Sequence, residues 1–344
     1  PVRTDSAAAM TADPLDKPAA PSPMVHASAA MREILVLVGR VATGDAKVLI
    51  TGESGVGKDL IAREIHARSA RAGRPFIAVN CAGLTETLLE SELFGHVKGS
   101  FTGAYRDKPG KLESAHMGTV FLDEIGEMTL RMQGLLLRFL ETGEIQRVGA
   151  DGGARHVNVR VIGATHRNLR EMIAQGAFRE DLYYRLNVIQ IAVPPLRERR
   201  EDIPLLVQHF LERLSVESGR PAITVSQEAI RRLMAYSWPG NVRQLENAIE
   251  RALAFSKGRA QLDVQDLAPD IQSQPDAPGE ADGWFPEEGI DFDRYVEAIE
   301  LSLIRRSLER TQGNKRQAAR LLNLKRTTLI EKLKRLEPPA SPKA

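Results

Sequence analysis

One segment of the chain reads Lys47-Val48-Leu49-Ile50-Thr51-Gly52-Glu53-Ser54-Gly55-Val56-Gly57-Lys58-Asp59, and it sets the class of the fold. Residues 47–51 are mostly β-branched or apolar, which predicts a buried parallel strand. The glycines that follow let backbone N–H groups face the β- and γ-phosphates of a nucleotide, and Lys58 places a positive charge on them. A helix is expected from Asp59 to Ser69, which completes the strand, loop and helix order of a phosphate-binding loop.

Asp59 departs from the general pattern of such loops, in which a Ser or Thr hydroxyl reaches Mg²⁺. Two interpretations stay open for this residue. Its carboxylate holds the metal directly or through water, or it is an ordinary acidic residue that favours the first turn of a helix. For the whole loop, the alternative is a glycine-rich turn that binds no nucleotide.

A second apolar strand, Thr119 to Leu122, ends in the acidic pair Asp123 and Glu124. In nucleotide hydrolysis the first carboxylate of such a pair joins the Mg²⁺ shell and the second polarises the attacking water. Both are candidate catalytic residues, and Asp123 is also a candidate metal ligand. A solvated strand end is the alternative, and the upstream phosphate-binding loop argues against it.

A third strand is expected from Val157 to Ala164, with Thr165 and His166 at its end. Polar side chains at this edge of a parallel sheet are placed to sense the γ-phosphate, and Thr165 is taken as a nucleotide-binding residue. For His166, a surface loop histidine is an equal alternative. Together the strands predict an α/β fold, with a parallel sheet between flanking helices.

The stretch from about Met24 to Phe255, about two thirds of the chain, resembles the AAA+ domain of bacterial enhancer-binding proteins. These proteins activate transcription with the sigma-54 form of RNA polymerase, and many have an acid where Asp59 stands. The matching strings are Gly52-Glu53-Ser54-Gly55, Asn80-Cys81-Ala82, Ser91-Glu92-Leu93-Phe94-Gly95-His96, Gly99-Ser100-Phe101-Thr102-Gly103-Ala104, Phe121-Leu122-Asp123-Glu124-Ile125, Pro194-Pro195-Leu196-Arg197-Glu198-Arg199 and Trp238-Pro239-Gly240-Asn241-Val242-Arg243.

The resemblance implies that the loop Gly99 to Ala104 contacts sigma-54, chiefly through Phe101 and Thr102. The family's loop usually reads Gly-Ala-Phe-Thr-Gly-Ala, and this chain has Ser100 in place of the first alanine. Serine is small and keeps the conformational freedom of the flanking glycines, so we expect the contact to survive. An ordinary surface turn with a buried phenylalanine is the alternative.

Other roles follow from the resemblance position by position. Asn80 is expected to couple Glu124 to the nucleotide state, and Arg243 to read the bound nucleotide from the lid. Arg179 and Arg185 are expected to be arginine fingers that reach the γ-phosphate of a neighbouring subunit, which makes hydrolysis depend on assembly. Without the resemblance, an Arg-rich stretch usually indicates a solvated face.

A small helical lid is expected over residues 194–260, after an ATPase core over residues 24–193. Two of its helices are predicted at 205–217 and 227–236. For the last helix, Asn241 is the predicted cap, with Gln244 completing a capping box three residues on. Apolar residues then recur at helical spacing. Nucleotide is expected between core and lid.

Composition bounds the rest of the chain. A length of 344 residues, 42% hydrophobic content and no long uncharged apolar run predict a soluble chain without a membrane span. Residues 1–23 are rich in Ala, Pro, Asp and Ser, and they are expected to form a disordered tail or linker. Cys81 is the only cysteine, so no intramolecular disulfide forms and a reducing cytoplasm is expected. The seven histidines show no metal-ligand spacing, and no structural metal is predicted.

The C-terminal part changes from acidic to basic. An acidic, Pro-containing linker is expected over residues 261–290, and a helix-turn-helix domain over residues 291–337, followed by a tail at 338–344. Its first helix is predicted at about 291–309, and Ala318 and Ala319 let two later helices cross closely. The candidate DNA-binding residues are Lys315, Arg316, Lys325, Arg326, Thr327, Thr328, Lys332 and Arg335.

This tail resembles the Fis-type DNA-binding domain that ends many enhancer-binding proteins. In that interpretation the start of the third helix, Arg326 to Thr328, faces base edges or nearby phosphates, while Lys332 and Arg335 meet the phosphate backbone. Such domains act as dimers on double-stranded DNA. A basic helical hairpin that binds a protein is the alternative.

Taken together, the motifs and resemblances predict a cytoplasmic, DNA-bound activator that assembles into a ring, hexameric by resemblance, with ATP and Mg²⁺ as cofactors. Its expected partner is the sigma-54 RNA polymerase holoenzyme. Two rivals stay open. A replication initiator or loader also joins this core to a helix-turn-helix but has no use for the Gly99 to Ala104 loop. A nucleotide-sensing regulator without hydrolysis has no use for Asp123, Glu124 and both arginines.

Overall fold

The chain divides into two units, residues 1–274 and 275–344. The computed structural model describes residues 24–218, 223–256 and 259–272 of the first. In the second it describes residues 304, 305, 307, 308, 310, 311, 314–322, 324 and 326–336. The predicted tail at 1–23 lies outside the described residues, as does most of the linker and of the first helix of the C-terminal domain.

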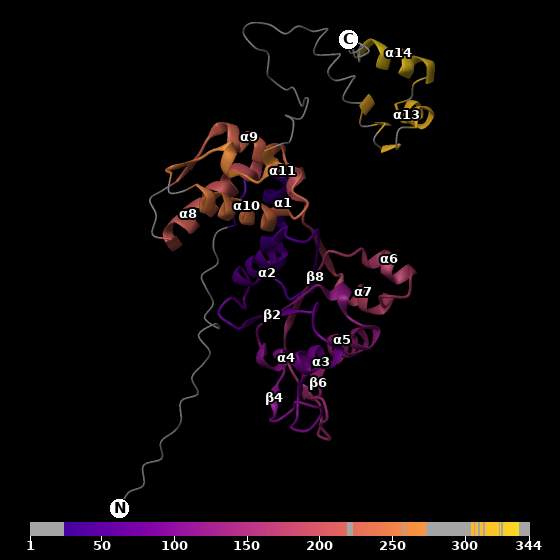
Figure 1. Ribbon diagram of the computed structural model, residues 1–344. Helices are drawn as coiled ribbons and strands as arrows, with labels where there is room; N and C mark the ends of the chain where they lie inside the picture. The colour runs from indigo at the N-terminus through magenta and orange to yellow at the C-terminus, as the bar shows by residue number, and fades with distance from the viewer. Residues whose placement is uncertain are drawn as a thin grey trace, which may run out of the picture. The chain divides into compact units, whose positions relative to one another are not determined.

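A five-stranded parallel sheet forms the centre of the first unit (Figure 1). Its strands, in spatial order, are β2 (Phe76–Asn80), β5 (Thr119–Asp123), β8 (Arg160–Thr165), β1 (Val48–Thr51) and β9 (Ile189–Ala192). Because all five run the same way, their carboxyl ends share one edge, and the predicted α/β fold is confirmed. The third predicted strand begins at Arg160 rather than Val157, because residues 155–156 pair in a separate hairpin and the Val157 N–H donates to the Gly143 carbonyl.

Helices cover both faces of this sheet, and each face has its own apolar cluster. Successive residues of a strand point to opposite faces, so Phe121 packs into one cluster while Val120 and Leu122 pack into the other. The helices of the core are α1 (Ala29–Ala42), α2 (Lys58–Ala67), α3 (Glu86–Phe94), α4 (Lys111–Ser114), α5 (Leu130–Thr142), α6 (Leu169–Ala174) and α7 (Glu180–Leu186). The helix predicted from Asp59 starts one residue earlier, at Lys58.

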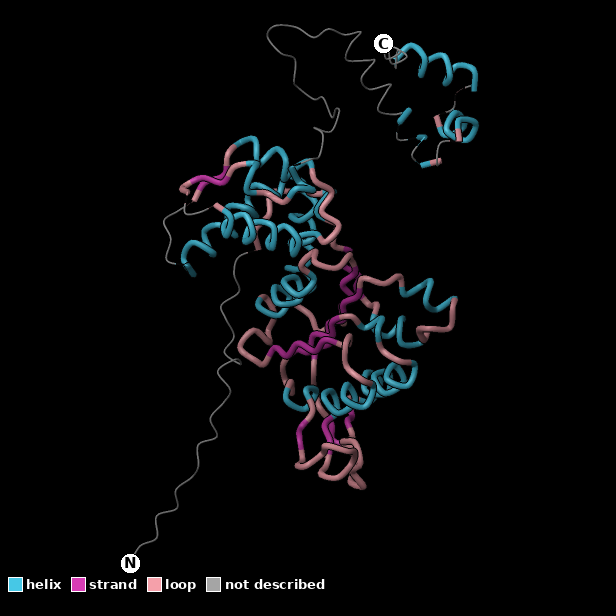
Figure 2. Tube along the Cα trace, viewed as in Figure 1, coloured by secondary structure: helices cyan, strands magenta, loops and turns pink. Residues whose placement is uncertain are grey.

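Two antiparallel hairpins project from the core on the side away from the lid helices (Figure 2). The first pairs β3 (Gly95–His96) with β4 (Lys108–Pro109), and it carries the loop 99–104 at its tip. The second pairs β6 (Glu144–Ile145) with β7 (Arg155–His156). The predicted protruding loop is therefore one of two neighbouring projections.

The lid has a hydrophobic core of its own around the fully buried Trp238, whose indole N–H donates to the Leu233 carbonyl at 2.7 Å. Leu262 and Ile271 pack into the same core, so the lid continues to Gln272. The predicted start of the linker at residue 261 is corrected accordingly. The elements of the lid are η3 (Leu196–Glu198), η4 (Arg200–Asp202), α8 (Ile203–Ser218), β10 (Thr224–Val225), α9 (Gln227–Ala235), α10 (Asn241–Phe255), β11 (Gln261–Leu262), η5 (Val264–Asp266) and α11 (Pro269–Gln272).

The second unit contains α13 (Lys315–Leu321) and α14 (Arg326–Leu336). Ile304, Ala318, Ala319 and Leu329 form its buried cluster, which confirms that the two alanines lie inside. None of the helices in the described ranges is both long and apolar enough to cross a membrane.

Candidate functional site

The phosphate-binding loop lies at the carboxyl edge of the sheet, between β1 and α2. Gly55 and Gly57 adopt positive φ angles of 77° and 97°, a left-handed backbone that favours glycine. Lys58 is 6% exposed, and its ammonium donates to the carbonyls of Gly52 at 2.9 Å and Glu53 at 3.1 Å. Burial lowers the pKa of Lys58, against the attraction of nearby carboxylates. The lysine charge thus lies inside the loop, where phosphate oxygens can replace the two carbonyls.

Asp123 and Glu124 end β5 at the same edge. Glu124 has a left-handed backbone with φ 54°, and its N–H donates to the Asp123 carboxylate at 3.0 Å. Its own carboxylate lies 3.8 Å from the Lys58 ammonium. Burial, and then the charge of Glu124, raise the pKa of Asp123. Two crowded carboxylates with few charges to offset them are a donor set that suits Mg²⁺, an oxygen-seeking cation.

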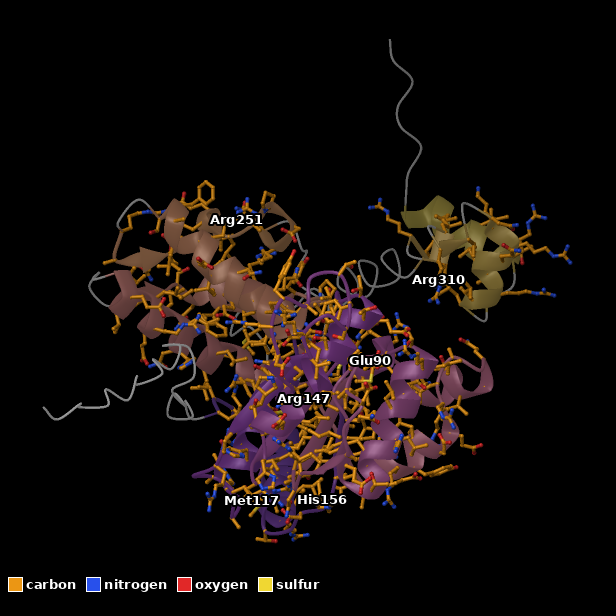
Figure 3. The ribbon with its side chains drawn as sticks, turned by 90° about the horizontal axis from the view of Figure 1, so that it is seen from below. Glu90, Met117, Arg147, His156, Arg251 and Arg310 are labelled. Atoms are coloured by element: carbon orange, nitrogen blue, oxygen red, sulfur yellow. The ribbon has the colours of Figure 1, made fainter. Side chains whose placement is uncertain are left out.

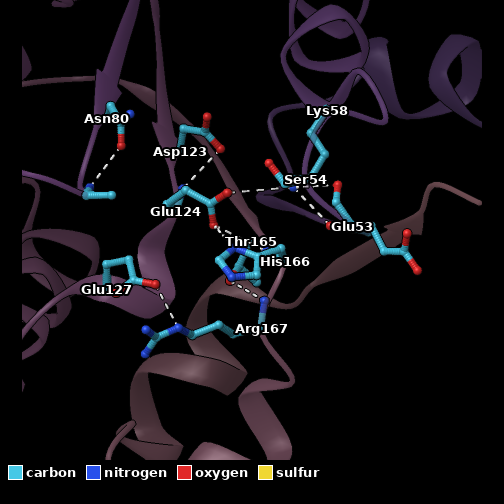
Figure 4. Close-up of polar contacts among 12 residues, drawn as sticks. Glu53, Ser54, Lys58, Asn80, Asp123, Glu124, Glu127, Thr165, His166 and Arg167 are labelled. Carbon is cyan, nitrogen blue, oxygen red and sulfur yellow. Dashed lines mark hydrogen bonds and ion pairs between the residues drawn. The ribbon is translucent and has the colours of Figure 1, made fainter. Parts of the chain in front are cut away.

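His166 is the polar partner of Glu124 in this structure (Figure 4). Its Nδ1 lies 2.6 Å from Glu124 Oε2, and its backbone N–H donates to the same oxygen at 3.3 Å. The sequence left this histidine open as an ordinary loop residue, and the fold brings it to the Glu124 carboxylate. Asn80 is next to Asp123 in the sheet register, and its side chain accepts a hydrogen bond from the Ala82 N–H at 2.8 Å. The expected coupling of Asn80 to Glu124 stays a prediction.

The end of β8 is joined to the segment that follows Glu124. Thr165 is fully buried, and its hydroxyl accepts a hydrogen bond from the Arg167 N–H at 3.0 Å. The Arg167 guanidinium lies 2.7 Å from the Glu127 carboxylate, at the end of the short helix η2 (Ile125–Glu127), as Figure 4 shows. Arg167 was missed from the sequence, where only its place two residues after Thr165 indicated a role. The γ-phosphate role of Thr165 is a prediction that this geometry leaves open.

Asn241 joins the lid to the phosphate-binding loop, and its predicted role as a helix cap is wrong. The residue is fully buried with φ 53°, and its amide donates to the Ser54 carbonyl at 3.0 Å and to Glu53 Oε2 at 3.1 Å. Its side-chain oxygen accepts a hydrogen bond from the Leu196 N–H at 2.8 Å. The cap position belongs to Gly240, whose N–H donates to the Gln244 side chain. Tertiary contacts therefore outweigh the local capping preference.

Glu53 and Arg243 complete the contact between loop and lid. The Glu53 carboxylate binds the Arg197 guanidinium through two hydrogen bonds of 2.7 and 2.9 Å, and these hold its pKa below the ordinary value. Arg243 is exposed, and it lies 3.4 Å from the Ser54 hydroxyl. Glu53 thus presents its carbonyl to Lys58 and its carboxylate to the lid. Asp59 is exposed in the first turn of α2, where its metal role stays a prediction.

The two expected arginine fingers lie at the start of α7 and within it. Arg179 immediately precedes α7 and binds Asp181 through hydrogen bonds of 3.0 and 2.7 Å, while Arg185, on α7, donates to the Leu140 carbonyl at 3.3 Å. Both residues are exposed. Because both guanidinium groups are exposed and bind only an exposed carboxylate or a single carbonyl in the described residues, they can exchange these partners for another charge.

The tip of the first hairpin is a closed turn. The Gly99 N–H donates to the Ala104 carbonyl at 2.8 Å, and the Phe101 ring lies edge-on to the His96 ring with 5.0 Å between centroids. Thr102 is exposed, whereas the Ser100 hydroxyl is buried without a hydrogen-bond partner in the described part of the chain. The aromatic ring is therefore partly sheltered at the tip rather than fully presented.

The second hairpin supports this tip. The Val97 N–H donates to the Val148 carbonyl at 3.1 Å, and Glu113 binds both Arg147 and Arg155. Figure 3 labels Arg147 and His156, which belong to the two sides of this hairpin. The two projections thus form one connected structure.

Comparison with known proteins agrees with this geometry. Residues 24–192 match the sigma-54 interaction domain, residues 197–283 the AAA+ ATPase lid domain, and residues 295–336 the bacterial regulatory protein, Fis family. The transcriptional regulatory protein ZraR of Klebsiella oxytoca is 47% identical over 322 residues, which cover 93% of this chain and 70% of ZraR. The chain belongs to the family of sigma-54-dependent transcriptional activators.

A second relative and a solved structure are also similar to this activator over most of its length. The transcriptional regulatory protein XylR of Pseudomonas putida is 44% identical over 327 residues, and the matched part is 92% of this chain but only 57% of XylR. The crystal structure of NtrX from Brucella abortus in complex with ATP is 36% identical and superposes with a TM-score of 0.67, covering 92% of this chain and 69% of NtrX.

The structure describes six of the eight candidate DNA-binding residues of the Fis-type unit at the level of side-chain exposure. Asn314 caps α13 by accepting from the N–H groups of Arg316 and Gln317. The exposed candidates are Lys315, Arg316, Arg326 and Thr327, with Thr328 and Lys332 half-buried. The side chains of Lys325 and Arg335 lie outside the described residues. DNA contacts by these groups stay predictions.

Proposed function

We propose that this activator hydrolyses ATP with Mg²⁺ in a homo-oligomeric ring, and that it thereby converts a closed sigma-54 RNA polymerase promoter complex into an open one. The observation that carries the proposal is the convergence of Lys58, Asp123 and Glu124 at one edge of the sheet, beneath a lid joined to the phosphate-binding loop. The ATP complex of the related NtrX supports a nucleotide at this place.

Each residue near the edge has a role in this proposal. Lys58 and the backbone of Gly52–Gly57 hold the phosphates, Asp123 takes part in the Mg²⁺ shell, with Asp59 as a second candidate ligand, and Glu124 accepts the proton of the attacking water. Mg²⁺ supplies neutralisation of the charge that develops on the phosphate oxygens. His166 binds Glu124 in this structure, and we expect Asn80 to bind it in another nucleotide state, so that its readiness to act depends on which of them holds it.

Assembly supplies what a single subunit lacks. Arg179 and Arg185 face solvent, and we place them at the γ-phosphate of the neighbouring subunit, with Arg243 reading the nucleotide from the lid of its own subunit. A finger that stabilises transition-state charge is worth about 10³-fold or more in rate. A hexameric ring, by analogy with the family, gives every site a finger.

Two surfaces convert hydrolysis into transcription activation. The tip Gly99–Ala104, with Phe101 and Thr102 foremost, contacts sigma-54, and the Fis-type unit binds DNA upstream of the promoter as a dimer. In this proposal the activator acts in the cytoplasm, where both partners are found.

Promoter melting tests the proposal directly. The purified chain is incubated with sigma-54 holoenzyme and a promoter that carries an upstream site, with ATP or with a non-hydrolysable analogue. Single-stranded thymines are then detected by permanganate footprinting. We expect melting with ATP only; hydrolysis without melting would refute the proposed coupling, and absence of hydrolysis would refute the enzyme.

A further inference from the structure

Gln133 is a fully buried polar residue in the first turn of α5, with 0% of its surface exposed. Its side-chain amide donates to the Met128 carbonyl at 2.9 Å and to the Ala177 carbonyl at 3.1 Å. Its side-chain oxygen accepts a hydrogen bond from the Arg179 N–H at 2.8 Å. Both amide protons and the oxygen are therefore used, all on backbone groups.

These three bonds connect two separate segments of the chain. Met128 directly follows η2, the turn that begins after Glu124, whereas Ala177 and Arg179 belong to the turn that leads into the finger helix α7. Figure 1 shows α5 beside α7, and the two helices are in contact. A buried amide is tolerated only when its hydrogen bonds are made. The Gln133 side chain therefore fixes the position of one turn relative to the other.

The first of these turns is itself tied to the hydrolysis site. Arg167 binds Glu127 at 2.7 Å and donates to the Gly126 carbonyl at 3.4 Å, and the preceding residue His166 binds Glu124. A continuous set of contacts therefore leads from the catalytic carboxylate, through η2, to the Met128 carbonyl and Gln133.

The second turn presents a finger. The Arg179 backbone is held by Gln133 and its neighbour Phe178 is buried, while its guanidinium is exposed and paired only at the surface with Asp181. A fixed backbone with an exposed side chain defines where the guanidinium can reach. Movement of the η2 turn would displace this anchor through the single Gln133 amide.

We propose that Gln133 is a positioning residue, which sets the finger Arg179 of a subunit according to the state of that subunit's own hydrolysis site. The inference rests on the proposed function, because it requires that Arg179 acts on a neighbour. Gln133 then passes information around the ring in one direction, from each site to the finger that the same subunit donates.

Mixed rings separate this role from a purely structural one. One subunit, the reporter, carries Arg179→Ala with Arg185→Ala and keeps its own site; the other, the donor, carries Glu124→Gln and keeps its fingers. Phosphate release from the mixture reports donation of fingers to the reporter. Gln133→Met in the donor keeps the side-chain volume but removes all three bonds, and we expect phosphate release to fall by at least about tenfold, because small misplacements of catalytic groups are costly.

The same Gln133→Met change in the reporter should alter phosphate release by less than about twofold, since Arg167 still holds the η2 turn there. Gly134→Ala in the donor is the matched control, because a Cβ at this adjacent position meets no atom within 4 Å. Equal losses in donor and reporter would show a structural residue and overturn the inference. No loss in the donor would overturn it as well.

A mixture that shows no activity even without a Gln133 change would refute trans fingers, and hence the proposed function rather than this inference alone. If Gln133→Met fails to fold, Gln133→Glu replaces it. The carboxylate still accepts from the Arg179 N–H but repels the two carbonyls, and protonation restores one donor. Phosphate release with the Gln133→Glu donor, divided by that with the unsubstituted donor, should then rise as the pH is lowered. A ratio that does not change with pH would contradict the assignment.

Discussion

Charge burial dominates the site at the scale of single residues. Burial lowers the pKa of Lys58 and raises that of Asp123, so each group is held in a setting that disfavours its own charge. Phosphate and Mg²⁺ bring charges of the opposite sign to these two groups. The site without ligands is therefore electrostatically incomplete, and binding is expected to relieve that cost.

Glu124→Gln tests the catalytic carboxylate. The amide keeps the shape of the side chain but cannot accept the proton of water, so ATP binding should persist while turnover falls by about 10²-fold or more. Fluorescent nucleotide titration and phosphate release measure the two quantities. Wild-type turnover in this variant would remove Glu124 from its role.

Asp123→Asn tests whether the ionised Asp123 carboxylate, whose pKa is raised, lowers the free energy of unfolding. Because the folded pKa lies above the unfolded one, the ionised carboxylate destabilises the folded protein at pH values above the folded pKa, and the effect vanishes below the unfolded pKa. The variant without nucleotide should therefore have a higher Tm at pH 7.5, and this gain should disappear in acid.

MgATP should stabilise the wild type but have little effect on the Tm of Asp123→Asn, because the metal loses a ligand. Asp151→Asn is the matched control, since Asp151 is exposed on the second hairpin loop and no charge relief is expected there. A lower Tm of Asp123→Asn without nucleotide would contradict the electrostatic account.

At the scale of elements, the proposed sigma-54 contact lies on a hairpin apart from the proposed hydrolysis site. The tip lies on an antiparallel projection outside the parallel sheet whose strand β5 ends in Asp123 and is followed by Glu124. Its turn is closed by backbone hydrogen bonds, and Thr102 is exposed to solvent. A change at the tip should therefore leave the nucleotide site intact.

Thr102→Ala should keep ATPase activity within about twofold of the wild type and lose promoter melting, because it deletes a surface hydroxyl without leaving a cavity. Phosphate release and permanganate footprinting on the same preparation measure the two. Thr87→Ala, on the exposed side of α3, is the control, and it should leave both ATPase activity and promoter melting unchanged. Full melting by Thr102→Ala would exclude this hydroxyl from the sigma-54 contact.

Arg326→Ala tests the start of α14 as a DNA-contacting element. Loss of one phosphate contact should weaken binding and reduce the slope of log K against log salt by about 0.9. A contact to a base edge instead costs about 1–3 kcal/mol on the specific site alone. Binding to specific and unrelated duplexes over a salt series measures both. Arg251→Ala, on the lid, should change neither the DNA affinity nor the salt slope. If Arg326→Ala binds DNA as the wild type does, a hairpin that binds a protein is favoured instead.

At the scale of the whole molecule, activity should depend on assembly, because the fingers and the phosphate they serve lie on different subunits in the proposed ring. Specific phosphate release should rise steeply with protein concentration and then level off. Analytical ultracentrifugation over the same range shows whether the rise follows oligomer formation. A constant specific activity at all concentrations would place hydrolysis in the single subunit.

Motif residues were predictable because their chemistry depends on local spacing. The strand, glycine loop and lysine at 48–58, and the acids that end β5, could be located without coordinates, and the fold confirmed them. Asn241 was predicted wrongly, since capping rules describe a helix by itself while its amide binds a loop nearly 190 residues earlier in the chain. The membership of residues 261–272 in the lid was missed for the same reason, because short apolar segments show which core they join only by packing.

The order of residues was enough to predict the AAA+ core, the lid and the Fis-type tail, since each has a short sequence pattern. Folding decided which side chains meet: His166 with Glu124, and Gln133 with the turns at Met128 and Arg179. Such contacts join segments far apart in the chain, and a hydrogen bond depends on distance and direction in space. Neither quantity is present in local spacing, which is why these links became visible only in the folded chain.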